Sequence, residues 1–82
     1  MWAGTNFDYE TDAVTDVYGP FDTKLQAVDA IRQRAESEFE VLSKSWKDAK
    51  IFDTLEAEGT LEITFDDAND NGYLYQIMEM EP

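Results

Sequence analysis

The fold is decided by residues 19–46, which read GPFDTKLQAVDAIRQRAESEFEVLSKSW. Gly19-Pro20-Phe21 breaks an extended segment, and Asp22 or Thr23 then offers a side-chain oxygen to the free amides of a first helical turn. The apolar residues that follow recur at spacings of three and four: Leu25, Val28, Ile31, Ala35, Phe39, Leu42 and Trp46. This spacing predicts one amphipathic helix over residues 23–46, about 36 Å long. The apolar side of this helix must be buried, and the flanking segments have to pack against it.

The segment before the helix has the alternating pattern of a half-buried strand. Residues 7–13 alternate between apolar or small and acidic or polar side chains, so we expect Phe7 and Tyr9 to face the helix. The opposite face would then carry a row of carboxylates about 6.7 Å apart: Asp8, Glu10 and Asp12. A second extended run at residues 14–18 either pairs with the first or continues it through a bulge. We favour a hairpin that turns near Thr11-Asp12.

The segment after the helix contains a short apolar set and a clear strand. Ile51, Phe52 and Leu55 fit one or two further helical turns, and Gly59 ends that piece. Residues 60–66 alternate cleanly and predict a strand. Its inward-facing residues would be Leu61, Ile63 and Phe65.

The last strand is predicted over residues 73–80, and its register depends on the turn before it. Asn71-Gly72 is a strong signal for a two-residue hairpin turn, because both central residues of a type I′ turn need positive φ. Taken literally, this turn pairs Phe65 with Met78 and Ile63 with Met80. It also places three apolar residues on the outer face: Tyr73, Tyr75 and Ile77. A longer loop turns the tyrosines inward instead.

Together these segments predict a single small acidic domain, residues 1–82, of the α+β class. Its antiparallel sheet has three or four strands, and the long helix packs on one face, in the order (β)β-α-(short α)-β-β. The predicted core is a set of large apolar side chains and one alanine: Phe7, Tyr9, Phe21, Leu25, Val28, Ile31, Ala35, Phe39, Leu42, Trp46, Leu61, Ile63 and Phe65.

Composition narrows the function. The chain has 19 acidic and 6 basic residues, a net charge of −13, and no histidine or cysteine. All six bases lie within residues 24–50, so the flanking segments carry acids alone. Such a chain repels nucleic acid and anionic lipid and attracts basic surfaces. No apolar run approaches a membrane span and no signal peptide is evident, so we expect a cytoplasmic protein.

One stretch resembles a metal-binding motif. Residues 67–72, DANDNG, fit D-x-[DN]-x-[DN]-G, the opening of an EF-hand calcium loop. In that interpretation the side-chain ligands are Asp67, Asn69 and Asn71. However, the twelfth position is Met78 instead of a bidentate glutamate, and the flanking segments read as strands. We therefore favour an acidic turn, and the sequence predicts no cofactor.

The acidity itself is the second candidate feature. Duplex DNA presents one charge per about 3.4 Å on each strand, and carboxylates on two neighbouring strands give a comparable line charge. The protein is similar in charge and length, and in those respects alone, to phage-borne DNA-mimic inhibitors of restriction, repair or CRISPR nucleases. An acidic solubility adaptation, as in salt-loving organisms, or a generic interaction domain is the alternative.

We therefore expect a non-enzymatic, monomeric or homodimeric module that binds a basic protein surface, such as that of a nucleic-acid-binding protein, and no nucleic acid directly. Catalysis is not expected, because no metal-ligand cluster, phosphate-binding loop or distinct pair of carboxyls emerges. The expected partner-binding residues are acidic side chains and two tyrosines: Asp8, Glu10, Asp12, Glu62, Asp66, Asp67, Asp70, Tyr73, Tyr75, Glu79 and Glu81.

Overall fold

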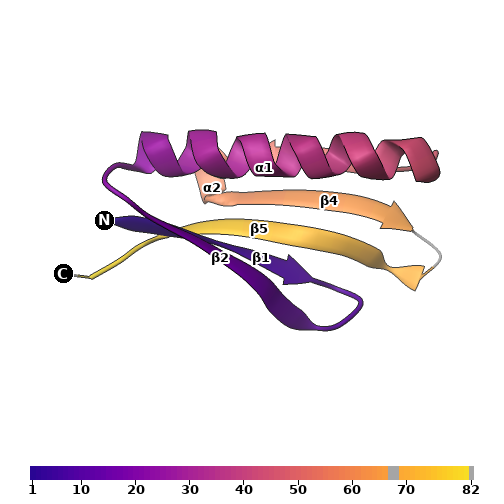
Figure 1. Cartoon of the computed structure of the whole chain (residues 1–82), viewed down its shortest axis with the longest axis horizontal. Coiled ribbons are helices and arrows are strands. Elements are labelled where there is room, and N and C mark those ends of the chain that lie inside the picture. The colour runs from indigo at the N-terminus through magenta and orange to yellow at the C-terminus, as the bar shows by residue number, and fades with distance from the viewer. Residues whose placement is uncertain (67–68, 82) are drawn as a thin grey trace.

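A computed structural model describes residues 1–66 and 69–81 and shows one long helix lying on a five-stranded antiparallel sheet (Figure 1). The elements in chain order are β1 (Trp2–Asp8), β2 (Ala13–Phe21), α1 (Lys24–Ser45), β3 (Lys50–Thr54), α2 (Leu55–Glu58), β4 (Thr60–Asp66) and β5 (Asn71–Glu79). The strand order is β2-β1-β5-β4-β3. The α+β class and the single long helix are thus confirmed, whereas the sheet has five strands and not three or four.

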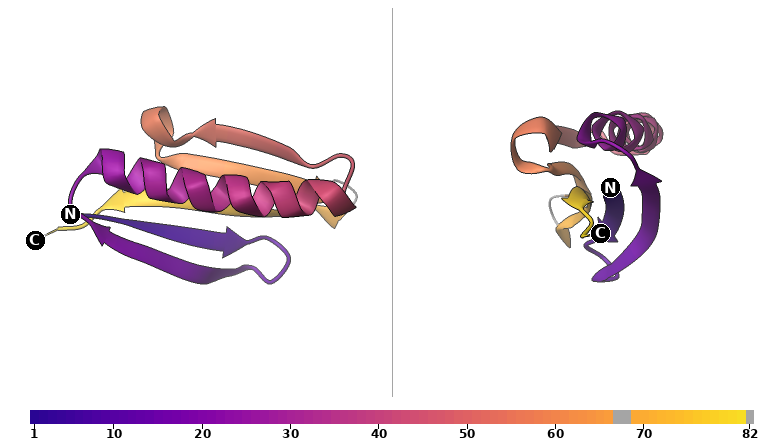
Figure 2. Two further views of the ribbon diagram at one scale, coloured as in Figure 1. Left: turned by 45° about the horizontal axis from the view of Figure 1, so that its top comes forward. Right: turned by 90° about the vertical axis from the view of Figure 1, so that its left-hand side faces the viewer.

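The molecule has two layers and is elongated, measuring 41 × 21 × 19 Å. β5 is central, with the β1–β2 hairpin on one side of it and the β3–β4 pair on the other (Figure 2). The end-on view in Figure 2 shows the sheet curling under α1, so that β2 and β3 form its two edges. Both chain ends lie at the same end of the molecule, next to the start of α1.

The long helix begins and ends as the sequence predicts. The Thr23 hydroxyl accepts a hydrogen bond from the Gln26 amide at 3.2 Å, which caps the first turn. At the other end the Trp46 amide donates to the Leu42 carbonyl. Four helix residues are fully buried against the sheet: Ala27, Val28, Ile31 and Ala35.

The buried stripe of α1 is narrower than predicted. Leu25 is 65% exposed and Trp46 40% exposed, and neither belongs to the core. Phe39 and Leu42 are half-buried at its margin. The buried face is centred nearer Ala27, because small side chains allow the helix axis to approach the sheet closely, whereas Leu25 lies about 60° round the helix from Val28.

The N-terminal strand faces the other way from the prediction. Gly4, and not an aromatic residue, lies beneath the helix, and a Cβ built there would fall against the Ile31 side chain. Since side chains alternate along a strand, Asn6 and Asp8 share the face of Gly4. Phe7 and Tyr9 therefore lie on the outer face of the sheet, where their rings meet edge to face at 5.9 Å. An alternating pattern specifies two faces but does not say which one the helix covers.

The segment after α1 begins with a strand, and the predicted helical turns are confirmed only as the single turn of α2. Ile51 and Phe52 belong to β3, which pairs antiparallel with β4. Leu55 is the fully buried first residue of the four-residue α2, which ends at Gly59 as expected. The apolar spacing of this short set fits a helix and a strand equally well, and pairing with the edge of β4 decides between them.

The pairing of the last two strands follows the longer-loop alternative. Ile63 pairs with Tyr73 and Leu61 with Tyr75, so the predicted pairs of Phe65 with Met78 and Ile63 with Met80 are wrong. β5 already begins at Asn71, which pairs with Asp66. The Asn71-Gly72 dipeptide is thus part of a strand and not the centre of a two-residue turn. The observed register differs from the literal two-residue turn by seven residues. Because a shift by an odd number moves every side chain to the other face, Tyr75 and Ile77 enter the core.

An ion pair links the helix to the edge strand β3. Arg32 Nε lies 2.6 Å from Asp53 Oδ2, and a second nitrogen of the guanidinium lies 3.3 Å from Oδ1. These hydrogen bonds, aided by one from the Leu55 amide, hold the pKa of Asp53 below its usual range, against the opposing effect of burial. The pair therefore stabilises the protein when Asp53 is ionised.

We expect Asp53→Asn to lower the melting temperature by about 2–4 °C near pH 7. A carboxyl whose pKa is lowered by folding contributes stability above its unfolded value, near pH 4, and loses it as the pH falls through the folded value. The difference from the wild type should therefore shrink as the pH falls below about 4 and disappear once Asp53 is protonated in the folded protein as well. Thermal melts across this range, with Asp48→Asn as the exposed control, measure it. A gap that persists at the lowest pH would contradict this origin.

Candidate functional site

Carboxylates from both ends of the sequence meet at one end of the molecule. The turn between β1 and β2 lies beside the start of β5, because Asp8 pairs with Tyr73 and the Tyr9 amide donates to the Gly72 carbonyl at 3.0 Å. Asp66, the last residue of β4, pairs with Asn71 at the same end. We call the resulting group the acidic end: Asp8, Glu10, Asp12, Asp66 and Asp70.

The acidic end is a cluster and not the regular row predicted from the sequence. β1 stops at Asp8, and Glu10 and Asp12 lie in the turn, where Asp12 has a left-handed backbone with φ of 56°. Glu79 and Glu81 lie at the other end of the molecule, near Trp2, about 25 Å away along β5. Asp67 lies outside the described residues. The predicted carboxylates therefore do not form a single surface.

A hollow of about 400 Å³ on the outer face of the sheet adjoins the acidic end and is lined by Tyr9, Glu62, Thr64, Asp66, Asp70 and Asn71. The Tyr9 hydroxyl donates to Glu62 Oε2 at 2.6 Å. Burial, together with this hydrogen bond and the charge of Glu62, raises the pKa of Tyr9 to about 12. Tyr9 therefore stays protonated at neutral pH and orients the Glu62 carboxylate within the hollow.

The calcium-loop candidate has amide groups turned toward a carboxylate. The side-chain nitrogens of Asn69 and Asn71 donate to Asp66 Oδ2 at 2.7 and 3.4 Å. These bonds tie Asn69 and the first residue of β5 to the end of β4. Among residues 1–66 and 69–81, no group of three or more acidic side chains is arranged to hold a metal ion.

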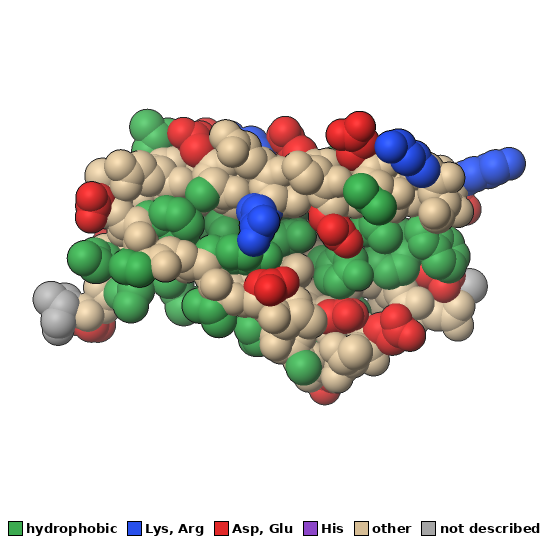
Figure 3. Space-filling model, in the orientation of Figure 1, with side chains coloured by type: hydrophobic (Ala, Val, Ile, Leu, Met, Phe, Trp, Pro, Cys, Tyr) green, Lys and Arg blue, Asp and Glu red, His purple; other side chains and the backbone are tan. Residues whose placement is uncertain are grey.

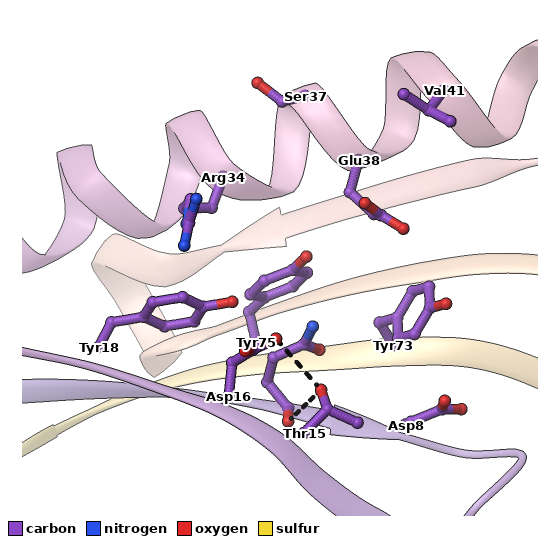
Figure 4. A pocket seen from close by; sticks show the side chains of 11 residues that line it. Asp8, Thr15, Asp16, Tyr18, Arg34, Ser37, Glu38, Val41, Tyr73 and Tyr75 are labelled. Carbon is purple, nitrogen blue, oxygen red and sulfur yellow. Dashed lines mark hydrogen bonds between the residues drawn. The ribbon is translucent and has the colours of Figure 1, made fainter.

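A hollow of about 500 Å³ lies between α1 and the part of the sheet formed by β2, β1 and β5. We call it the tyrosine groove. Tyr18 of β2 and Tyr73 and Tyr75 of β5 rise from the sheet, and Arg34 and Glu38 descend from α1 toward them (Figure 4). The remaining lining residues are Asn6, Asp8, Thr15, Asp16, Ser37 and Val41.

The groove is electronegative and its phenols stay protonated. Burial is the main cause of a raised pKa at Tyr18, Tyr73 and Tyr75. The charges of Asp8 and Glu38 add to this effect at Tyr73, and Asp16 adds to it at Tyr18. Among the described lining residues, three carboxylates are opposed by a single guanidinium, that of Arg34.

Arg34 already makes a cation–π contact inside the groove. Its guanidinium carbon lies 5.1 Å from the centre of the Tyr18 ring. Beyond it, a second hollow of about 490 Å³ continues along α1 and shares Tyr18, Arg34 and Ser37 with the first. In Figure 3 the two appear as a band of apolar side chains beneath the helix, with one basic group in the band and acidic groups along it.

Asn6 is the buried polar residue on the groove wall. Its side chain is 6% exposed, and its Oδ1 atom has no hydrogen-bond donor. The backbone carbonyl of Asn6, by contrast, accepts from the Thr15 hydroxyl at 3.3 Å. Buried acceptors almost always have a partner in native structures. The groove wall therefore contains one acceptor that has no hydrogen-bond donor among the described residues.

The structure thus distributes the predicted binding residues over four places, of which two are the β1–β2 turn, with Glu10 and Asp12, and the opposite end of the molecule, with Glu79 and Glu81. Asp8, Tyr73 and Tyr75 line the tyrosine groove. Glu62, Asp66 and Asp70 line the outer hollow. The prediction missed the groove residues Asn6, Asp16, Tyr18, Arg34 and Glu38. The spacing of Arg34 and Glu38, four apart on one flank of the helix, is the one sequence signal that pointed there.

The chain matches no described protein family, no curated protein and no solved structure. In the described ranges, neither helix is long and apolar enough to cross a membrane.

Proposed function

We propose that this protein is a non-catalytic cytoplasmic module, a monomer or homodimer, that binds a basic protein surface in the place of nucleic acid. The observation that supports it best is the acidic end. Turn and strand-end carboxylates from segments 60 residues apart in sequence are brought together there by the pairing of β1 with β5. Exposed carboxylates of one sign attract and orient a basic partner.

The positions of the bases favour the same function. Arg32 is paired with Asp53, and Lys24 donates to the Glu56 carbonyl, at the far end from the acidic cluster. Lys44, Lys47 and Lys50 flank the end of α1 and the start of β3, so they lie at the same end of the molecule as the acidic end, but on the β3 side of the sheet, opposite β2. The β1–β2 side of the acidic end is therefore left electronegative.

Neutralising the acidic end should weaken partner binding about tenfold at low salt. The variant is Glu10→Gln, Asp12→Asn and Asp70→Asn. Asparagine suits positions 12 and 70, because both have left-handed backbones, with φ of 56° and 53°, that asparagine tolerates. The protein is immobilised, a nuclease-treated cell lysate is passed over it, and the captured proteins are eluted with short duplex DNA.

The matched control removes the same number of charges at the opposite end, with Glu58→Gln, Glu79→Gln and Glu81→Gln. We expect this control to retain the partner, and we expect duplex DNA to elute a nucleic-acid-binding protein from it and from the wild type. The proposal would be refuted if both triple variants retained the same partner and duplex DNA did not elute it.

A further inference from the structure

We infer that the tyrosine groove is the receptor for an arginine or lysine side chain of the basic partner. This inference rests on the proposed function and assigns it a defined subsite. It depends on three separate properties of the groove: its charge, its aromatic walls and the unpartnered Asn6 oxygen.

The charge of the groove favours a cation. Asp8, Asp16 and Glu38 surround a space that holds the phenol rings of Tyr73 and Tyr75. The Arg34 guanidinium lies over Tyr18, which leaves the part of the groove between Glu38 and Asp8 without a base among its described lining residues. Carboxylates that are partly removed from water make short, strong hydrogen bonds to guanidinium and ammonium groups.

The walls suit the same ligand. A cation over the face of a tyrosine ring is attracted by the ring quadrupole, and the attraction increases when the site excludes water. The contact between Arg34 and Tyr18 shows this geometry within the chain itself, at 5.1 Å. Tyr73 and Tyr75 offer two more rings in the neighbouring part of the groove. The hollow of about 500 Å³ is large enough for a long basic side chain.

Asn6 provides the polar end of the site. Its Oδ1 lies beneath the groove surface without a donor. A half-turn of the carboxamide about its last side-chain bond brings this oxygen to the position of the amide nitrogen, next to the Tyr18 hydroxyl that lines the groove. A guanidinium or ammonium group carries several N–H donors, enough to reach both Asn6 and a carboxylate.

The groove also opens toward the acidic end. Asp8 belongs to both, and Tyr73 pairs with it across β1 and β5. A basic segment of the partner can therefore place one side chain in the groove while its neighbouring residues meet Glu10, Asp12 and Asp70. Contact with the groove adds selectivity to an attraction that is otherwise only electrostatic.

The test uses acetylated, amidated Gly-Arg-Gly as the probe and its citrulline counterpart, which has the same shape without the charge. Proton–nitrogen NMR spectra of the full chain are recorded during titration with each peptide at low salt. We expect the arginine peptide to bind with a Kd of roughly millimolar and to shift the Asn6 side-chain amide and the backbone amides of Asp16 and Tyr75. The citrulline peptide should leave these signals unchanged.

Two double variants identify the site. Asp16→Asn with Glu38→Gln should weaken binding of the arginine peptide at least about fivefold. Glu36→Gln with Glu40→Gln removes the same charge from exposed positions on the same helix and should change binding less than about twofold. Equal effects of the two double variants, or equal shifts with the citrulline peptide, would overturn the inference.

The outcome also separates this inference from the proposed function. If the arginine peptide shifts only the amides of Glu10, Asp12 and Asp70, the groove is not the receptor, while binding of a basic partner at the acidic end still holds. If partner capture from the lysate fails although the groove binds the peptide, the DNA-like role is wrong and the groove assignment stands.

Discussion

Replacing Gly72 with alanine should lower the free energy of unfolding by about 2–4 kcal/mol, one of the two largest effects expected in this chain. A Cβ at this position would fall against the Ile63 carbonyl oxygen and within 3.2 Å of the Tyr9 ring. It would also lie 3.3 Å from the Thr64 Cα. The obstruction is mainly backbone, so no side-chain rotation relieves it, and β4 and β5 must move apart.

Chemical denaturation followed by circular dichroism measures this effect. Gln76→Ala is the control, because Gln76 lies on the same strand and points to the outer face, and it should cost less than about 1 kcal/mol. A Gly72→Ala variant as stable as the control would show that β4 and β5 do not approach this closely. A midpoint lowered by about 10–20 °C is the corresponding thermal result.

The same glycine shows why strand register could not be predicted from the sequence. The Asn71-Gly72 dipeptide has two explanations, a turn that needs positive φ and a strand position that needs the absence of a side chain. Propensity favours the first, whereas the pairing of Gly72 with Thr64 and its contact with Tyr9 select the second. The tertiary contact lies outside the local sequence window, so the sequence alone left both alternatives for the faces of β5 open.

The helix was predictable because its signals are local and agree with one another. The cap at Thr23 and the three- and four-residue spacing both lie within residues 19–46, and the observed bounds follow them. The faces of β1 could not be predicted, because an alternating pattern does not say which of its two sets of side chains faces the helix. The face that contains Gly4 packs against the helix, because the missing side chain allows Ile31 to approach the strand. The alternating pattern gives no sign of this role of Gly4.

The candidate site, too, was predictable only where its features depend on local sequence and not on the fold. Charge and composition, which need no fold, predicted an acidic protein with carboxylates on the β1–β2 hairpin. The tyrosine groove needs three elements to meet, since Tyr18, Tyr75 and Glu38 lie on β2, β5 and α1. Its lining is therefore a property of the topology, and Asn6, an unremarkable polar residue in the sequence, becomes notable only once it is buried without a donor.

The second large effect is expected at Ile31, where alanine should destabilise the protein by about 3–4 kcal/mol. Ile31 is fully buried on the sheet-facing side of α1 and lies directly over Gly4. Truncation removes apolar contacts and leaves a cavity between rigid layers that cannot collapse completely. For a domain of this size, such a loss is a large share of the total stability. Leu25→Ala, on the same helix but 65% exposed, should cost less than about 1 kcal/mol.

A double variant tests whether this loss arises at the contact with Gly4. Gly4→Ala alone should destabilise, because the new Cβ meets the Ile31 side chain and lies 2.8 Å from its Cγ1 atom. In the Ile31→Ala background the same methyl group fills part of the vacated space. The double variant should therefore be at least as stable as Ile31→Ala alone, with a favourable coupling of about 1–2 kcal/mol. Simple addition of the two losses would mean that α1 does not approach β1 at Gly4, and the assignment of Asn6 and Asp8 to the helix-facing side would then fail with it.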